Sequence, residues 1–311
     1  MLVQDEIEII PLSVIIPTYN RCIILERTLL DILKQTKLPG EVIIIDASER
    51  DDSKLMCEKV SDSYLNVGSK LIYLKAKEKG AAKQRNFGVE KATNTIIGFC
   101  DDDIILQENC IGMLWTIINM PECGGVNAVI TNQKYHPIGI FSKMFYALIT
   151  GKIFKDYSGK CIGPLICFLP DDKKNCPDFI EVEWLNTTCT LYKKKILPEP
   201  VFDIHFTGYS LMEDLCLSLR VRKKYKLYNA CNARIYHDSQ PSQGKSNTLL
   251  ISEMDLVNRY YILKKVLKRN WLKNLFQLSL QQLFSLLTTR KIFNLDALKG
   301  KINGIRKIRS I

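Results

Sequence analysis

The first half of the chain alternates short apolar runs with amphipathic stretches. The apolar runs are rich in β-branched residues, as is typical of strands buried in a parallel sheet, and the stretches between them have helical spacing. We therefore expect strands at residues 12–16, 42–45, 71–74, 95–100 and 126–131, and helices at residues 23–33, 81–92 and 108–120. This alternation predicts an α/β fold with a mostly parallel, Rossmann-like sheet flanked by helices, in which ligands bind beyond the carboxyl ends of the strands.

The second half is less regular, and residues 134–178 predict no clear elements. Beyond them, the pattern indicates strands at residues 181–185, 189–192, 226–228 and 233–236, and a helix at residues 212–222. After residue 252 the chain is helical in character.

The net charge of +11 is concentrated at the end of the chain. From Arg259 onward there are 13 Lys and Arg against one acid, Asp296, which gives +12 and leaves −1 for the rest. A neutral globular part with a basic tail suggests that the tail contacts an anionic surface, either membrane or nucleic acid. No base-stacking motif or zinc finger accompanies the tail, so we expect no nucleic-acid partner.

The apolar run within the tail is too short and too polar to cross a bilayer. Spanning takes roughly 20 predominantly apolar residues, whereas Gln277, Gln281 and Gln282 interrupt this run. The pattern favours a basic helix that lies in the plane of an anionic membrane surface. The alternative is that the helices pack on the rest of the chain and their charges are solvated.

The first ten residues are acidic and lack the apolar run of a secretory signal. Eleven cysteines at irregular spacing include no CxxC, which argues against metal knuckles and a disulfide framework. Cys100, Cys189 and Cys216 stand among apolar neighbours and indicate buried thiols in a reducing compartment. We expect a cytoplasmic protein, peripheral on the inner face of the membrane if the tail binds there.

Three adjacent acids, Asp101, Asp102 and Asp103, follow the predicted strand at residues 95–100. Neighbouring carboxylates repel one another unless a positive charge lies among them. In an extended segment Asp101 and Asp103 point the same way, and two oxygen donors on one side suit Mg²⁺ or Mn²⁺ holding a diphosphate. The alternative is that Asp103 caps the next helix.

Other candidates are weaker when taken singly. Glu213 and Asp214 open the helix at residues 212–222, where acids also complement the helix dipole. His237 follows a short strand, but a lone histidine is more often structural than a metal ligand.

Residues 80–88 suit a phosphate or a nucleoside. Gly80 and the small residues after it let a ligand approach the backbone, and Lys83 and Arg85 could meet a phosphate or a base. Asp46, directly after a predicted strand, could accept a hydrogen bond from a ribose or base. The alternative for residues 80–88 is a surface helix with solvated charges, and the alternative for Asp46 is a turn residue.

The order of these motifs resembles the inverting glycosyltransferases of family 2, which have the GT-A fold. LSVIIPTYNR at residues 12–21 resembles the opening strand and nucleotide loop of that family, and VIIID at residues 42–46 resembles its next strand. GAAKQRNFG at residues 80–88 resembles its Gly…Arg-Asn-x-Gly segment. Residues 101–103 resemble its DxD motif, and Glu213-Asp214 and His237 resemble its ED pair and late histidine. The resemblance covers about residues 11–245.

The resemblance implies a role for each residue. The expected nucleotide-binding residues are Pro17, Thr18, Asn20, Arg21, Asp46, Lys83, Arg85, Asn86, Asp101 and Asp102. Asp103, with Asp101 and the later His237, would ligate the metal. Asp214 would be the general base on the acceptor hydroxyl, and Glu213 would position it.

The implied activity is transfer of a sugar from a nucleotide sugar, with UDP-sugar favoured, to a glycan or lipid-linked acceptor, as in surface polysaccharide or glycolipid synthesis. The departing nucleoside diphosphate carries negative charge that Mn²⁺ or Mg²⁺ neutralises. A carboxylate takes the proton of the acceptor hydroxyl. One displacement inverts the anomeric centre.

Two departures from the family pattern lie on the acceptor side. Trp184-Leu185 is followed by residues 186–188 (NTT) in place of a glycine pair, and Lys224 stands where a glycine is usual. Both departures concern the expected acceptor site, and the donor half matches the family pattern.

Other activities fit less well. A dinucleotide-binding dehydrogenase needs GxGxxG after its first strand, where this chain has PTYNR. A sugar nucleotidyltransferase would need a Gly-rich phosphate loop in the same place. A non-catalytic nucleotide-sugar-binding protein stays open if the ED pair is misplaced.

We expect a GT-A catalytic domain at residues 1–250, with a nucleotide-binding half at about 11–131 and an acceptor half at about 132–250. A helical basic tail, membrane-associated if it binds an anionic surface, would follow at residues 251–311.

Overall fold

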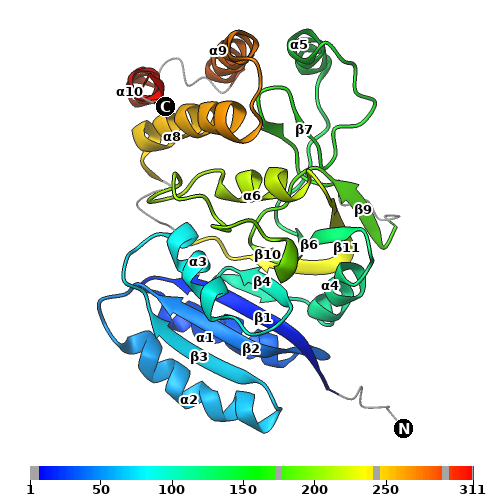
Figure 1. Ribbon diagram of the computed structural model, residues 1–311, viewed down its shortest axis with the longest axis vertical. Coiled ribbons are helices and arrows are strands. Elements are labelled where there is room, and N and C mark those ends of the chain that lie inside the picture. The colour runs from blue at the N-terminus through cyan, green and yellow to red at the C-terminus, as the bar shows by residue number, and fades with distance from the viewer. Residues whose placement is uncertain (1–6, 172–176, 241–245, 289–293, 310) are drawn as a thin grey trace.

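The computed structural model describes residues 7–171, 177–240, 246–288, 294–309 and 311 (Figure 1). Within these ranges a nine-stranded sheet has the order β3-β2-β1-β4-β10-β6-β11-β5, with β9 paired to β11. The strands are β1 (Glu8–Thr18), β2 (Lys37–Asp46), β3 (Lys70–Lys75), β4 (Ile96–Cys100), β5 (Ile104–Leu106), β6 (Cys123–Ile130), β9 (Phe179–Val182), β10 (Cys189–Lys193) and β11 (Lys226–His237).

The sheet is mixed and mostly parallel, as the alternating pattern predicted. β3, β2, β1 and β4 are parallel neighbours, and β6 is parallel to β11. β10 is antiparallel to both β4 and β6, so these two groups run in the same direction. The carboxyl ends of β1, β2 and β4, and of β6 and β11, therefore point to one edge of the sheet.

Helices cover both faces of this sheet (Figure 1). They are α1 (Cys22–Leu33), α2 (Asp52–Asn66), α3 (Ala81–Lys91), α4 (Cys110–Ile118) and α6 (Glu213–Val221). Alternate residues of a strand point to opposite faces, so Val14 and Ile16 of β1 join one buried core and Ile15 joins the other. Burial on both faces explains why the central strands are continuously apolar.

Two strands that were expected separately form a single strand. The strands predicted at residues 226–228 and 233–236 are one strand, β11. Its register against β6 shifts between Ala230 and Arg234, which pair with Ala128 and Val129. Three additional residues of β11 lie at this bulge, and they broke the alternation that the prediction relied on.

Other elements had not been predicted. The helix α2 and the short antiparallel strand β5 were missed. Residues 134–171 contain α5 (Ile140–Thr150) and a hairpin of β7 (Cys161–Ile162) and β8 (Ile166–Cys167).

The basic C-terminal part folds into helices that pack on one another. They are α8 (Thr248–Tyr261), the short helix η2 (Ile262–Val266), α9 (Trp271–Thr288) and α10 (Leu295–Ile308). Ile262 and Leu263 of η2 are buried against Leu215 and Leu219 of α6. None of the helices in the described ranges is both long enough and apolar enough to span a membrane. The division of the chain at residue 250 stays a prediction.

The described cysteines are mostly buried thiols. Cys100, Cys189 and Cys216 are free and buried, as expected from their apolar neighbours. Cys231, at the β11 bulge, is disulfide-bonded. The other nine described cysteines are free thiols.

The helix α3 lies unusually close to β1 because Gly88 has no side chain. A Cβ atom at Gly88 would lie 2.4 Å from Cγ2 and 3.3 Å from Cβ of Ile15, whose own side chain is fully buried. The same helix carries Arg85 and Asn86, so this close contact positions them against the strands.

We predict that Gly88→Ala destabilises the protein. Overpacking a core costs about 1–3 kcal/mol, and the better helix propensity of Ala returns roughly 1 kcal/mol at most. Gly139→Ala is the matched control, because nothing lies within 4 Å of a Cβ atom built there. Chemical denaturation should show a lower midpoint for Gly88→Ala only, and equal midpoints would contradict the close packing.

Candidate active site

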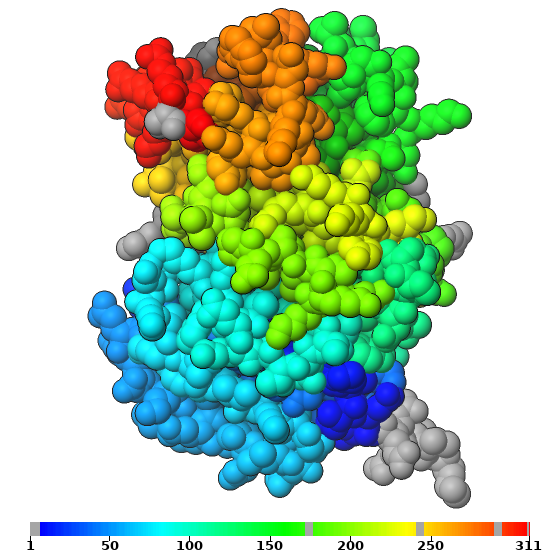
Figure 2. Space-filling model, viewed as in Figure 1, coloured from blue at the N-terminus to red at the C-terminus, as the bar shows by residue number. Residues whose placement is uncertain are grey.

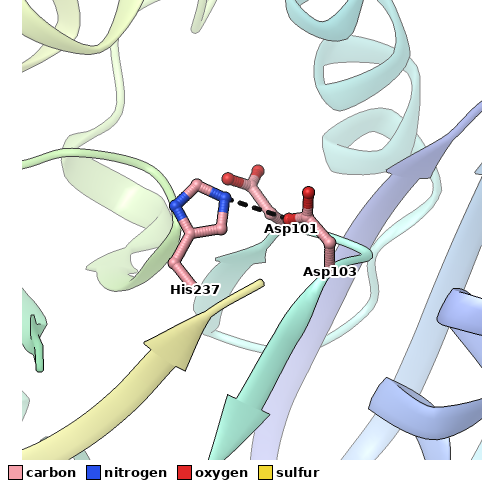
Figure 3. A group of neighbouring side chains, drawn as sticks. All are labelled: Asp101, Asp103 and His237. Carbon is pink, nitrogen blue, oxygen red and sulfur yellow. Dashed lines mark ion pairs between the residues drawn. The ribbon is translucent and has the colours of Figure 1, made fainter. Parts of the chain in front are cut away.

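The three acids predicted as a metal site lie between β4 and β5, at the edge where the parallel strands end. Residues 102 and 103 form a turn, not the extended segment that was expected, yet Asp101 and Asp103 still lie on one side. Asp102 points toward the loop after β1, whereas Asp101 and Asp103 converge with His237 from β11 (Figure 3). One ligand atom from each of these three residues lies within 4.8 Å of the other two.

Asp102 links the acidic loop to the loop after β1. Its carboxylate accepts hydrogen bonds from Thr18 Oγ1 at 2.7 Å and from Arg21 Nη1 at 3.0 Å. Burial raises the pKa of Asp102 to about 6, although Arg21 and Thr18 act in the opposite direction. These contacts give Thr18 and Arg21 a clear structural role.

Asp103 is held from three sides. Its carboxylate lies 3.1 Å from Nε2 of His237 and 3.3 Å from Nη1 of Arg21, and it accepts the backbone N–H of Gln240 at 3.1 Å. Burial alone would raise its pKa, but the hydrogen bonds from His237 and Gln240 hold the pKa of Asp103 below its usual value. Because β5 follows directly and α4 begins only at Cys110, Asp103 does not cap that helix.

The repulsion among the three acids is offset by the protein itself. Arg21 pairs with Asp102 and Asp103, and Arg85 pairs with Asp101 at 2.8 Å. The acids therefore do not require a cation in order to lie together. What favours a metal is the convergence of two carboxylates and an imidazole on one point, a donor set that suits Mn²⁺.

Arg85 joins the two acidic motifs. Its guanidinium lies 2.8 Å from Asp101 and 2.6 Å from Glu213, and the residue is only 4% exposed. Burial lowers the pKa of Arg85, but the two carboxylates outweigh it and raise the pKa above the usual value. We had expected Arg85 to meet phosphate or base. Asp101 lies 16 positions and Glu213 lies 128 positions from Arg85 along the chain, so the sequence gives no sign of this bridge.

The ED pair begins α6, as predicted. The helix starts after Met212, whose φ of 74° is left-handed, and both acids lie in its first turn, where they also complement the helix dipole. Glu213 is buried and Asp214 is half-buried. Burial raises the pKa of Asp214 to about 6, so this carboxylate ionises just below neutral pH.

The nucleotide loop lies beside the end of β2. Asn20 adopts a left-handed φ of 54°, and its N–H donates to Ser48 Oγ at 2.7 Å. Asp46, fully buried, accepts the N–H of Ser48 at 2.8 Å and the hydroxyl of Tyr73 at 2.9 Å. The bond to Ser48 supports the turn role of Asp46, and its contact with a nucleoside stays a prediction.

Three further predicted residues lie along the same edge. Pro17 is half-buried in β1, opposite Ile45 of β2. Lys83 is exposed and pairs with Glu78. Asn86 exchanges two hydrogen bonds of 2.8 Å with the backbone of Phe202. Their nucleotide-binding roles stay predictions.

Comparison with known proteins finds glycosyltransferases. Residues 13–197 match the family described as Glycosyl transferase family 2. A curated relative, the GalNAc(5)-diNAcBac-PP-undecaprenol beta-1,3-glucosyltransferase of Campylobacter jejuni, is 24% identical over 239 residues, which are 76% of this chain and 68% of that protein.

Solved structures share the fold at low sequence identity. The mannosyltransferase PcManGT from Pyrobaculum calidifontis, in complex with GDP-Man and Mn²⁺, has a TM-score of 0.56 at 12% identity and covers 96% of this chain and 87% of its own. GalNAc-T7 with UDP, GalNAc and Mn²⁺ has a TM-score of 0.54 at 16% identity and covers 81% of this chain and 49% of its own.

The family match extends over more than half of the chain, and the acidic loop, nucleotide loop and ED helix lie where the motif order placed them. The chain has the GT-A fold and belongs to glycosyltransferase family 2.

Proposed function

We propose that this glycosyltransferase moves a hexosyl group from a nucleoside-diphosphate sugar to an acceptor hydroxyl with inversion at the anomeric carbon. The observation that carries the proposal is the convergence of Asp101, Asp103 and His237 at the carboxyl edge of the sheet. Arg85 connects this cluster to Glu213, beside Asp214, so the donor and acceptor halves meet there.

The donor half suits a nucleotide sugar. Thr18, Asn20 and Asp46 lie at adjoining strand ends, where α/β folds bind nucleotides. PcManGT was solved with GDP-Man and GalNAc-T7 with UDP, so relatives of this fold take different nucleotides. We take a UDP-sugar as the first candidate donor, and a panel of nucleotide sugars decides among them.

Asp101, Asp103 and His237 are the residues that would hold Mn²⁺ or Mg²⁺. Such an ion supplies positive charge against the diphosphate that leaves. The imidazole favours Mn²⁺, since Mg²⁺ prefers oxygen ligands.

Asp214 is the general base in this proposal. It takes the proton of the acceptor hydroxyl while the oxygen attacks the anomeric carbon from the face opposite the diphosphate, and the bond to that diphosphate breaks. Glu213, fixed by Arg85, positions the start of α6 and with it Asp214. A single displacement gives an inverted product.

The acceptor is a glycan or a lipid-linked glycan. The support is the Campylobacter jejuni relative, whose name specifies a PP-undecaprenol substrate. Surface polysaccharide or glycolipid synthesis at the inner face of the membrane, from the cytoplasm, belongs to the same proposal.

Chelation should abolish transfer. We expect EDTA to remove activity and Mn²⁺ to restore it. Asp103→Ala and His237→Ala should also lose Mn²⁺ binding, measured by titration calorimetry without turnover. Glu108→Ala, which removes an exposed acid after β5, is the control and should bind Mn²⁺ normally. Full transfer in the presence of chelator would rule out metal dependence.

Asp214→Asn keeps the shape of the side chain and removes the proton acceptor. General-base catalysis contributes on the order of 10²–10⁴-fold, so kcat should fall by that factor while donor affinity is retained. The exposed Asp296→Asn serves as a control and should leave kcat unchanged. A near-normal kcat in Asp214→Asn would place the base elsewhere, whereas donor binding without transfer in the unaltered protein would indicate a binding module.

The transfer rate should also show an acid limb. The base works only when ionised, and burial raises the pKa of Asp214 to about 6. The value of kcat/KM should therefore fall as pH drops below about 6, by roughly tenfold per pH unit, and stay level above that pH. The residual activity of Asp214→Asn should lack this limb, and an unchanged limb in the variant would assign it to another group.

A further inference from the structure

The helix α9 packs its amide side chains inward and exposes many of its large apolar side chains. Four of its amide side chains are at least 90% buried: Asn274, Gln277, Gln281 and Gln282. Besides Trp271 at its first position, four of its large apolar side chains are more than half exposed: Leu272, Phe276, Leu283 and Leu287. A water-facing helix shows the reverse arrangement.

Specific hydrogen bonds fix this orientation. Gln277 donates to the carbonyl oxygen of Ile149 at 2.6 Å, and Gln282 donates to the carboxylate of Asp255 at 3.1 Å. Turning α9 so that its amides face water would break both bonds. The same packing keeps Leu272, Phe276, Leu283 and Leu287 on the outer side of α9.

The helix α5 extends the exposed apolar surface. Phe145 of α5 stacks on Phe284 of α9 with ring centroids 3.8 Å apart. Four other side chains of α5 are between 65% and 82% exposed: Ile140, Phe141, Met144 and Leu148. The two helices lie together at one end of the molecule, beyond α6 and far from α2 (Figures 1 and 2). We call these eight exposed side chains of α5 and α9 the α5–α9 face.

Basic side chains surround a cavity between the same elements. The cavity, of about 430 Å³, is lined by residues of α5, of the β7–β8 hairpin and of the first turns of α9. Its charged residues are Lys152, Arg222, Arg269 and Lys273 against one acid, Glu183. Arg222 pairs with Glu183 at 2.8 Å, so three positive charges remain beside the apolar face.

We propose that the α5–α9 face docks on an anionic phospholipid membrane, with lipid phosphates at the basic cavity and the apolar side chains in the interfacial region. An apolar helix face flanked by Lys and Arg is the pattern of proteins that lie in the membrane interface. The docking does not depend on catalysis. In one respect it extends the proposed function, because it holds the enzyme at the surface where lipid-linked acceptors lie.

The charges favour a membrane over a second copy of the chain. In a twofold dimer through the α5–α9 face, the basic cavity of each copy would approach its own counterpart, and like charges would repel. Anionic headgroups are complementary to the same charges.

Vesicle co-sedimentation tests the docking. Full-length protein should bind vesicles of phosphatidylcholine and phosphatidylglycerol in equal parts at low salt, and bind less at high salt or to phosphatidylcholine alone. Phe276→Glu/Leu283→Glu should weaken binding about tenfold or more, and Lys152→Glu/Lys273→Glu should do the same.

Matched variants of α2 control for charge and for surface hydrophobicity. Leu55→Glu/Leu65→Glu alters two side chains that are 55% and 59% exposed at the opposite end of the molecule, and Lys54→Glu/Lys59→Glu reverses two exposed lysines there. Both should bind vesicles like the unaltered protein. Equal loss in these controls would show that overall charge, not the α5–α9 face, governs binding, and would overturn the proposal.

Two other outcomes would also overturn it. The first is no vesicle binding by the full-length protein at low salt. The second is a dimer in light scattering that Phe276→Glu/Leu283→Glu converts to monomers without any change in vesicle binding. Vesicle binding is measured without donor, and donor hydrolysis is measured without vesicles, so failure of the docking and failure of the proposed transferase activity are distinguishable.

Discussion

The arrangement of the site depends on one buried cation. Arg85 lies between Asp101 and Glu213, which belong to a strand end and to a helix start that the chain brings together only in the folded state. A buried guanidinium is tolerated only when carboxylates surround it. Burial raises the pKa of Glu213 to about 8, and Arg85 opposes that rise. The distance between the metal-binding acids and the base is therefore fixed by a charge requirement as well as by packing.

Arg21 completes this balance on the other side of the acidic loop. With Arg21 on Asp102 and Asp103, and Arg85 on Asp101, the strongest repulsions are neutralised before any ligand binds. The polypeptide alone can thus hold the carboxylates in place. A preformed site of this kind loses little conformational freedom when a donor binds.

The sequence predicted the buried strands of the donor half, but it missed α2 and β5 there and the elements of residues 134–171. The strands β1, β2 and β4 are buried on both faces, so their apolar runs were unambiguous. The elements of residues 134–171 could not be predicted from the pattern of apolar residues. The helix α5 exposes four of its large apolar side chains, and the strands of the β7–β8 hairpin have only two residues each. Likewise, the order of motifs indicated which residues gather, but the ion pairs of Arg85 and the engagement of Asn86 by Phe202 depend on three-dimensional distance.

The bulge in β11 has a consequence for where His237 lies. Between Ala230 and Arg234 this strand takes four steps while β6 takes one, from Ala128 to Val129. At about 3.3 Å per residue, the three additional residues withdraw the end of β11 by roughly 10 Å relative to an unbroken ladder. If residues 231–233 instead continued the ladder unbroken, His237 would lie three residues beyond its place beside Asp103, whereas deletion of these three residues would leave Arg234 opposite Val129 and the imidazole where it is.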